Sequence, residues 1–329
     1  MSSLLFVSKP SAENFILNYT RLISKFEPAS SLLVTDDEIR AANAAKDYET
    51  IIFEWANDFT AQCLAFDYQG KKLIVRVHDH EVRKGRIHNI PWHKVDAAWF
   101  INQEVEKQFL FQYPHVKTFY LPNAIDPRHF TFNPHKEKKI GLLSLFARTR
   151  KRIDRAIEVM RYLQEIDPGW ELHIKCHPDN PEYREGKNRE GNYTYNELKK
   201  MSAGLPVIWH ASNWKGSGPG WYGEARAEVN EFFQDKAVVL STSEHEGFHF
   251  TVGEAALTGA LPVVYNWEFG NPLQFWAPYV CQSTRSMAEF ISHSQSPASH
   301  RRYVLERFSP EILIPQLLQK IKQATYETA

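Results

Sequence analysis

Two glutamates, Glu246 and Glu254, lie on either side of a turn in the stretch STSEHEGFHFTVGEAALTGALPVV, residues 241–264. The pattern changes between them from strand-like to helix-like. The N–H groups at the start of a helix carry a partial positive charge, which suits a phosphate. Two carboxylates beside such a site are costly unless they cap backbone N–H groups or accept hydrogen bonds from neutral hydroxyls. The hydroxyls of a sugar and a ribose would supply those bonds.

The helix expected in this stretch has its own start and stop signals. Thr251 and Glu254 have the spacing of a capping box, and Gly259 can end the helix in a left-handed conformation. Gly247 lets the backbone approach a ligand closely. The plainer interpretation is that Glu254 only caps this helix and that Glu246 is a solvated loop residue.

Other polar residues also follow apolar runs, and ligands bind beyond the carboxyl ends of parallel strands. His78 follows IVRV, Arg148 follows LLSLF, and His177 follows HIKC. His177, with Trp209 and His210 in VIWHASNW, could line a pocket for a base, the indole stacking on its ring. The alternative is a core position, which is more common for a buried tryptophan.

The run from His78 to Glu81, which also contains Asp79 and His80, consists entirely of metal-ligand residue types. Side chains alternate between the two faces of a strand, so at most two of the four converge. We therefore expect no metal site here.

The whole chain has the composition of a soluble globular protein. It has 329 residues, enough for two domains, and equal numbers of basic and acidic residues, 39 of each. This balance disfavours a nucleic acid partner, and the three cysteines lack zinc or redox spacing. We see no secretory signal and no membrane span. These features predict a cytoplasmic protein, at most in peripheral contact with the inner face of the membrane.

Apolar runs alternate with helix-period segments along the chain, which predicts parallel sheets covered on both faces. The predicted strands are 3–8, 30–35, 49–55, 71–79, 96–101 and 117–123, then 140–146, 170–176, 205–210, 237–243 and 261–266, with a helix at about 153–165. We expect an acceptor-side domain at 1–133, a donor-side domain at 134–310 and a final helix at 311–329, which can pack back on the first domain. The polar segment after residue 130 is the expected linker.

The stretch that contains the two glutamates resembles the signature of retaining glycosyltransferases of family four (glycosyl transferases group 1). This resemblance implies an α/β fold of the GT-B type, two Rossmann-like domains with parallel sheets facing across a cleft. It implies that Glu246 is catalytic and lies beside the donor sugar, and that Glu254 binds the ribose. Backbone N–H groups of Gly247, Phe248 and His249 would face the sugar and diphosphate. The family often has a small residue in place of His249.

Three further segments are similar to the same family. In SLFARTRKRIDRAIEVM, Arg148 and Lys151 match the pair that holds the donor diphosphate, while Arg150 and Arg152 are expected to be solvated. FYLPNAIDPRHF resembles the turn before the interdomain linker. LIVRVHDHE resembles the strand whose following histidine, here His78, approaches the donor sugar as a catalytic residue. The glycine-rich first loop of the family is absent from FVSKPSAENF.

The resemblance implies an enzyme of the hexosyltransferase type, which moves a sugar from a nucleotide diphosphate to a hydroxyl of a glycan or glycolipid. The donor would be of the UDP or GDP type, with no other cofactor and no metal. Bacterial surface polysaccharide or glycoconjugate synthesis is the commonest setting of such chains. The alternatives are a sugar-nucleotide epimerase of the same architecture and a non-catalytic sugar-nucleotide-binding protein.

Overall fold

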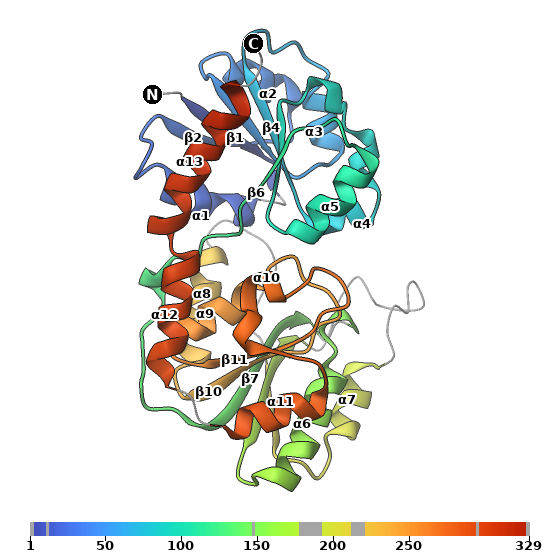
Figure 1. Ribbon diagram of the computed structural model, residues 1–329, viewed down its shortest axis with the longest axis vertical. Helices are drawn as coiled ribbons and strands as arrows, with labels where there is room; N and C mark the ends of the chain where they lie inside the picture. The colour runs from blue at the N-terminus through green and yellow to red at the C-terminus, as the bar shows by residue number, and fades with distance from the viewer. Residues whose placement is uncertain are drawn as a thin grey trace. The chain divides into compact units, whose positions relative to one another are not determined.

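The computed structural model describes residues 3–10, 13–146, 149–177, 193–211, 221–293 and 296–326. The chain divides into two compact units (Figure 1). The first unit is Met1–Ala124 with Phe308–Ala329, and the second unit is Ile125–Arg307.

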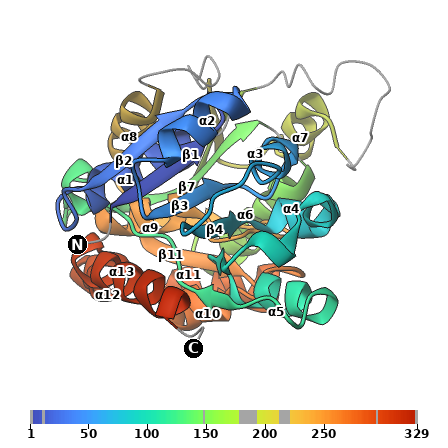
Figure 2. The same cartoon turned by 90° about the horizontal axis from the view of Figure 1, so that it is seen from above.

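The first unit is built on a parallel sheet with the strand order β2-β1-β3-β4-β5-β6. Its strands are β1 (Leu4–Ser8), β2 (Ser30–Val34), β3 (Thr50–Glu54), β4 (Lys72–Val77), β5 (Ala97–Phe100) and β6 (Thr118–Tyr120). Its helices are α1 (Glu13–Ile23), α2 (Glu38–Ala45), α3 (Asp58–Cys63), α4 (Asp79–Arg83), α5 (Gln103–Gln112) and α13 (Pro310–Tyr326), with short 3₁₀ turns η2 (Arg86–Asn89) and η3 (Trp92–Lys94). Figure 2 shows β2, β1, β3 and β4 in that order. The final helix, α13, packs against α1 and β6 of this unit.

The second unit has a parallel sheet with the order β12-β11-β10-β7-β8-β9. Its strands are β7 (Glu137–Phe146), β8 (Glu171–His177), β9 (Val207–Ala211), β10 (Lys236–Ser241), β11 (Leu261–Tyr265) and β12 (Val280–Cys281). Its helices are α6 (Ile153–Ile166), α7 (Tyr195–Met201), α8 (Trp221–Phe232), α9 (Phe250–Leu257), α10 (Leu273–Trp276), α11 (Thr284–Ser292) and α12 (Pro297–Phe308), with 3₁₀ turns η4 (Pro127–His129), η5 (Thr149–Lys151) and η7 (Ala277–Tyr279). Helices α6 and α11 pack side by side (Figure 1).

Every apolar run that predicted a strand forms one, and the two parallel Rossmann-like sheets confirm the predicted fold class. Strands β1 and β3 are buried along their whole length, as expected when helices cover both faces of a parallel sheet. Sequence reasoning missed β12, because a strand of two residues has no periodic pattern to detect.

The polar segment after residue 130, expected as a linker, lies inside the second unit. Its backbone is fixed by neighbouring helices, because the Thr131 N–H donates to Oδ1 of Asn230 at 2.8 Å and the Asn133 N–H donates to the Thr258 carbonyl at 3.0 Å. Polar composition alone does not reveal such pairing.

The interior of the second unit leaves no room for a side chain at Gly253 of α9. An added Cβ atom would lie 2.2 Å from Cδ1 of Ile125 and 3.1 Å from Cη2 of Trp276. Both of these side chains are fully buried. Gly253→Ala should therefore lower the free energy of unfolding by about 1 to 3 kcal/mol, the usual range for overpacking, although alanine favours the helix by roughly 1 kcal/mol.

Ile125→Val removes the methyl group that would clash with that Cβ atom. The double variant should consequently be more stable than the sum of the two single changes predicts. Urea denaturation of the three variants and the wild type measures this coupling, and strictly additive effects would show that the clash does not exist.

Candidate functional site

The candidate site of the second unit forms where two adjacent strands end. Strands β7 and β10 are parallel neighbours, so the segments that follow them, 149–152 and 242–249, leave the same edge of the sheet. The segments are joined directly: the Glu244 N–H donates to the Arg150 carbonyl at 2.8 Å, and Oγ1 of Thr242 donates to the Lys151 carbonyl at 2.8 Å. The two loops therefore hold each other in place.

Glu246 is buried at the centre of this pair of loops. Its Oε1 accepts hydrogen bonds from Nζ of Lys151 at 2.5 Å and Oγ of Ser243 at 2.8 Å, and its Oε2 accepts one from Nη1 of Arg150 at 3.1 Å. Burial raises the pKa of the Glu246 carboxyl, but the charges of Lys151 and Arg150 outweigh that effect and hold the pKa well below its ordinary value. Glu246 is an ionised carboxylate between two cations and not a solvated loop residue.

The expectation that Arg150 and Arg152 are solvated was wrong. Arg150 bonds Glu246, and Arg152 forms ion pairs with Asp154 at 2.8 Å and with Glu244 at 3.1 Å. A run of basic residues at a loop does not reveal which of them turn inward. Arg148 lies outside the residues that the structure describes.

The residues after Glu246 anchor the loop in the core. Phe248 is buried and packs edge-on against Phe250 and Phe275. Its carbonyl accepts a hydrogen bond from Nε1 of Trp276 at 3.3 Å. The side chain of Phe248 thus packs inside the protein, and only its backbone is available to a ligand. Gly247 precedes it at a half-buried position.

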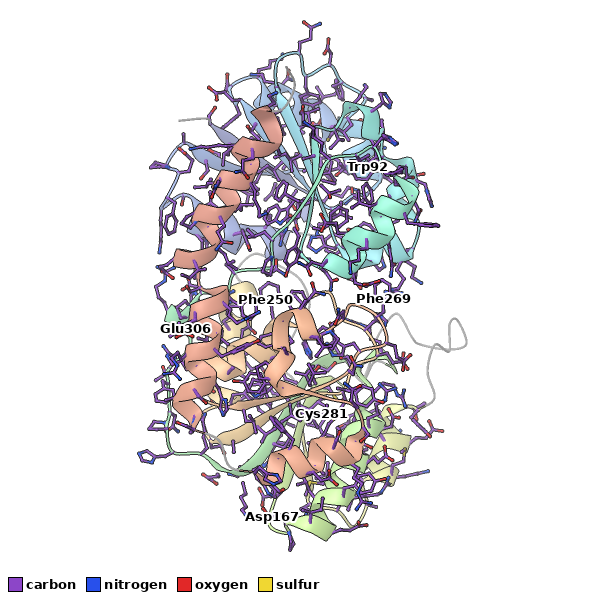
Figure 3. All side chains as sticks on the ribbon, viewed as in Figure 1. Trp92, Asp167, Phe250, Phe269, Cys281 and Glu306 are labelled. Atoms are coloured by element: carbon purple, nitrogen blue, oxygen red, sulfur yellow. The ribbon has the colours of Figure 1, made fainter. Side chains whose placement is uncertain are left out.

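The loop is also tied to the segment that follows β11. The Phe269 N–H donates to the Glu244 carbonyl at 3.3 Å, and His245 forms an isolated parallel bridge with Phe269. Figure 3 labels Phe250, at the start of α9, and Phe269, which comes from the segment after β11. Segments that follow β7, β10 and β11 therefore all contribute to one site.

His249 lies at the N-cap of α9 with φ of 62°, a left-handed conformation that is uncommon for a residue with a side chain. Its Nδ1 is 2.7 Å from Oγ of Ser241, and its Nε2 is 3.4 Å from Nζ of Lys151. Desolvation of the ring, and then the Lys151 charge, lower the pKa of His249 to about 3. The imidazole is therefore neutral at neutral pH.

The predicted capping box at Thr251 and Glu254 was wrong. Helix α9 already begins at Phe250, so Thr251 lies inside the helix. The prediction failed because His249 takes the capping position with a left-handed backbone, which its residue type does not suggest. The predicted helix end was correct, since α9 stops at Leu257 and Gly259 has φ of 101°.

Glu254 is buried and points toward α8, where Nε of Arg226 lies 3.7 Å from its Oε1. Desolvation raises the pKa of Glu254, and the Arg226 charge opposes that rise. Desolvation also lowers the pKa of Arg226 to about 10. Since Glu254 does not occupy a capping position, its burial requires a reason other than helix initiation.

In the first unit, His78 follows β4 and is fixed from several directions. Its Nε2 is 2.8 Å from Oε1 of Glu54, its backbone N–H donates to Oε2 of Glu81 at 2.7 Å, and its ring stacks on Trp55 with centroids 4.5 Å apart. The other metal-ligand types nearby, Asp79 and His80, begin α4. The geometry makes His78 part of a buried network.

Sequence reasoning missed the rest of that network. Nη1 of Arg76 bonds both oxygens of Glu54 at 2.9 Å, and Nη2 donates to Oδ1 of Asn123 at 2.5 Å. The guanidinium lies over the rings of Trp99 and Tyr19, 4.5 and 5.0 Å from their centroids. Burial raises the pKa of Glu54, but Arg76 and His78 outweigh it and lower the pKa. The sequence did contain a signal of this network, because each of two apolar strands carries an oppositely charged residue, Glu54 in β3 and Arg76 in β4.

The residues proposed for a base pocket have other partners. Nε1 of Trp209 donates to Oγ of Ser202 at 3.2 Å, and its ring packs edge-on against Tyr195. Nε2 of His210 is 2.9 Å from Nδ1 of His173. These contacts favour a packing role for both residues. His177 ends β8, and its side chain lies outside the described part of the structure.

Two negative findings apply to the described residues alone. None of their helices combines the length and apolar character needed to cross a membrane. Within the same ranges, no three His, Cys, Asp or Glu side chains are grouped so that they could hold a metal ion.

No protein-family model matches the sequence, and no curated protein matches it. TarM superposes with a TM-score of 0.62 over 91% of this chain at 17% identity, and this chain spans 57% of the TarM chain. Sucrose-phosphate synthase from Thermosynechococcus elongatus has a TM-score of 0.68 at 12% identity, with 100% of both chains covered.

The lipopolysaccharide outer core galactosyltransferase WaaB has a TM-score of 0.63 at 13% identity, covering 98% of this chain and 99% of its own. A variant of S. aureus TarM was solved with UDP and α-GlcNAc-glycerol bound. These neighbours are GT-B glycosyltransferases, and the two parallel six-stranded sheets described above fit the two Rossmann-like domains of that fold. The chain therefore has the GT-B fold.

The neutral His249 gives the stability of the protein a measurable pH dependence. Its folded pKa of about 3 lies below the ordinary value of 6.5, so below pH 6.5 the unfolded chain binds a proton that the folded chain does not. Stability should therefore be lost as the pH falls from 6.5 toward 3, by about 1.4 kcal/mol per pH unit. His249→Asn removes the titrating ring and with it this pH dependence. Between pH 7 and pH 5 the wild type should therefore lose about 2 kcal/mol more unfolding free energy than the variant.

Ser241→Ala is the matched control, because it removes a partner of the ring and keeps the imidazole. Its stability should be lower at pH 7, with the same pH slope as the wild type. Urea denaturation at both pH values measures the difference. A His249→Asn variant with the wild-type slope would contradict the neutral state of His249.

Proposed function

We propose that the chain is a glycosyltransferase that moves a sugar from a nucleotide diphosphate donor to a hydroxyl acceptor, with retention at the anomeric carbon. The observation that carries this proposal is the buried Glu246 carboxylate held by Lys151 and Arg150 at the carboxyl ends of β7 and β10. A carboxylate in that setting can accept bonds from sugar hydroxyls while the adjacent cations attract a diphosphate.

The donor would be held by the second unit. Glu246, Arg150 and Lys151 together carry one net positive charge, and the start of α9 adds its partial positive charge. Arg148 would add a further positive charge, because the family resemblance pairs it with Lys151 at the donor diphosphate. Backbone N–H groups of residues 247–249 would face the sugar and diphosphate, and Glu254 would accept bonds from the ribose.

The transfer itself requires the departing diphosphate to be stabilised and the acceptor to be oriented. Preorganised cations stabilise charge without rearranging during the reaction, so we propose that Lys151 and its neighbouring arginines do this without a metal ion. The proposed route is front-face attack, in which the acceptor hydroxyl approaches the anomeric carbon on the same face as the leaving diphosphate and a diphosphate oxygen takes the acceptor proton. An enzyme nucleophile, as in retaining glycosidases, is the alternative. His78, which Glu54 orients, is also proposed to be a catalytic residue.

The proposed substrates follow the chemistry of the neighbouring structures. TarM was solved with UDP and α-GlcNAc-glycerol, and WaaB is a galactosyltransferase. A donor of the UDP or GDP type and a glycan or glycolipid acceptor, in surface polysaccharide or glycoconjugate synthesis, are therefore proposed here. Peripheral contact with the inner face of the membrane would suit a lipid-linked acceptor.

Binding of UDP or GDP should raise the melting temperature, because a ligand of the folded state stabilises it by mass action. At 100 times Kd the gain is about 2.7 kcal/mol, which corresponds to roughly 5 to 10 °C for a unit of this size. Differential scanning fluorimetry measures the shift. EDTA should leave it unchanged.

Replacing Arg148 and Lys151 together with Ala should remove most of that shift. Lys138→Ala is the control, since Lys138 is a surface lysine paired with Asp167 at 2.7 Å and should keep the full shift. A full shift in the double variant would rule out these two residues as the diphosphate site.

Glu254→Gln should weaken UDP binding by about 1 to 3 kcal/mol, because it weakens charge-assisted bonds to the ribose hydroxyls. The control ligand is a UDP analogue that lacks both ribose hydroxyls. The variant and the wild type should bind this analogue with equal affinity. Calorimetry with both ligands separates loss of ribose contacts from a general loss of the fold. Equal losses for the two ligands would assign Glu254 a structural role.

Glu246→Gln should behave differently from Glu254→Gln. It should bind free UDP at least as tightly as the wild type, because Lys151 and Arg150 no longer share a carboxylate. Turnover with an intact sugar nucleotide should fall on the order of 100-fold, the scale of one lost positioned group. Identical responses of the two glutamine variants would contradict their separate roles.

A further inference from the structure

His249 combines an uncommon backbone conformation with two polar contacts of its ring. Its backbone is left-handed at φ 62°, its Nδ1 lies 2.7 Å from Oγ of Ser241, and its Nε2 faces a lysine at 3.4 Å. A residue with a side chain in this conformation is strained, and such strain concentrates at functional sites. The helix start alone does not explain the choice of histidine, because glycine would adopt the same backbone without strain.

The ring belongs to a chain of polar contacts that ends at Glu246. Nε1 of Trp267 donates to Oγ of Ser241 at 3.3 Å, and that hydroxyl contacts His249. His249 contacts Lys151, which donates to Glu246 at 2.5 Å. Trp267 and Ser241 are both buried. The contacts thus connect the interior of the second unit to the ammonium group of Lys151.

The chemistry of these groups fixes the direction of the bonds. An ammonium group can only donate, so Nε2 of His249 must offer its lone pair to Lys151, and the ring proton is on Nδ1. Nδ1 then donates to Oγ of Ser241, which accepts from Trp267 as well. The pKa of His249, lowered to about 3, keeps the ring in this neutral form. A protonated imidazole would repel Lys151 instead of accepting from it.

Lysine has a long flexible side chain, and its ammonium group is a compact charge without a preferred direction. In this site the carboxylate of Glu246 and the imidazole of His249 both contact the ammonium group. We propose that His249 is a positioning residue, whose neutral Nε2 holds the Lys151 ammonium where a diphosphate will bind. This inference rests on the proposed function for the identity of the ligand. It assigns a role to the side chain of His249, in addition to the role proposed for its backbone N–H.

Two matched substitutions separate positioning from a structural role. The carbonyl oxygen of Gln can take the place of Nε2 and accept from Lys151, whereas the shorter Asn reaches only the place of Nδ1, beside Ser241. Asn tolerates a left-handed backbone better than Gln. His249→Asn should therefore be the more stable of the two variants, and His249→Gln the better binder.

The experiment measures Kd for UDP and for inorganic pyrophosphate by calorimetry, and stability by urea denaturation, at pH 7. His249→Asn should weaken both ligands on the order of 10-fold, as expected for a lost hydrogen bond to a charged group. His249→Gln should recover most of that loss although it is less stable. The control is His300→Asn, which removes another histidine of the second unit, buried and 3.3 Å from the Tyr279 hydroxyl, and should bind both ligands like the wild type.

The outcomes separate this inference from the proposed function. If the wild type binds neither ligand, the proposed function fails. If the wild type binds both ligands and the two His249 variants rank in the same order for stability and for affinity, His249 is only structural and this inference is overturned. Opposite rankings support it.

Discussion

A buried carboxylate must be neutralised by its surroundings, and the site of the second unit is organised around this requirement at Glu246. The carboxyl group is almost inaccessible, yet it remains ionised because Lys151 and Arg150 bond its two oxygens. Removing a partner from such a group leaves an uncompensated charge, which is strongly destabilising. The contact between the two loops that carry these residues therefore contributes to the stability of the second unit.

The sheet topology makes this contact feasible across a long stretch of sequence. Lys151 and Glu246 are 95 residues apart, but they follow strands that are neighbours in a parallel sheet. Parallel strands end at one edge, so residues just beyond them meet without a special connection. The backbone bonds from Glu244 and Thr242 then set the register between the two loops.

The sequence predicted the elements well and the contacts less well, for a physical reason. Buried parallel strands require apolar runs, and every such run became a strand. The inward turn of Arg150, the left-handed His249 and the buried Arg76 depend on tertiary packing, which overrides local preference. Thr251 and Glu254 have the spacing of a capping box, but the predicted cap at Thr251 was wrong. His249 is the N-cap residue and the helix begins at Phe250.

Each unit holds a buried carboxylate with cationic partners, but the two sites differ in how far those partners are exposed to solvent. In the first unit, Glu54 is bonded by Arg76 and His78, and the guanidinium is enclosed between aromatic rings. In the second unit, the Arg150 side chain that bonds Glu246 is 34% exposed. A cation that reaches solvent can exchange a carboxylate for an incoming phosphate, whereas an enclosed one cannot without unfolding its surroundings. Of the cations that bond these two carboxylates, Arg150 is therefore the one that a ligand could reach from solvent, whereas Arg76 is enclosed.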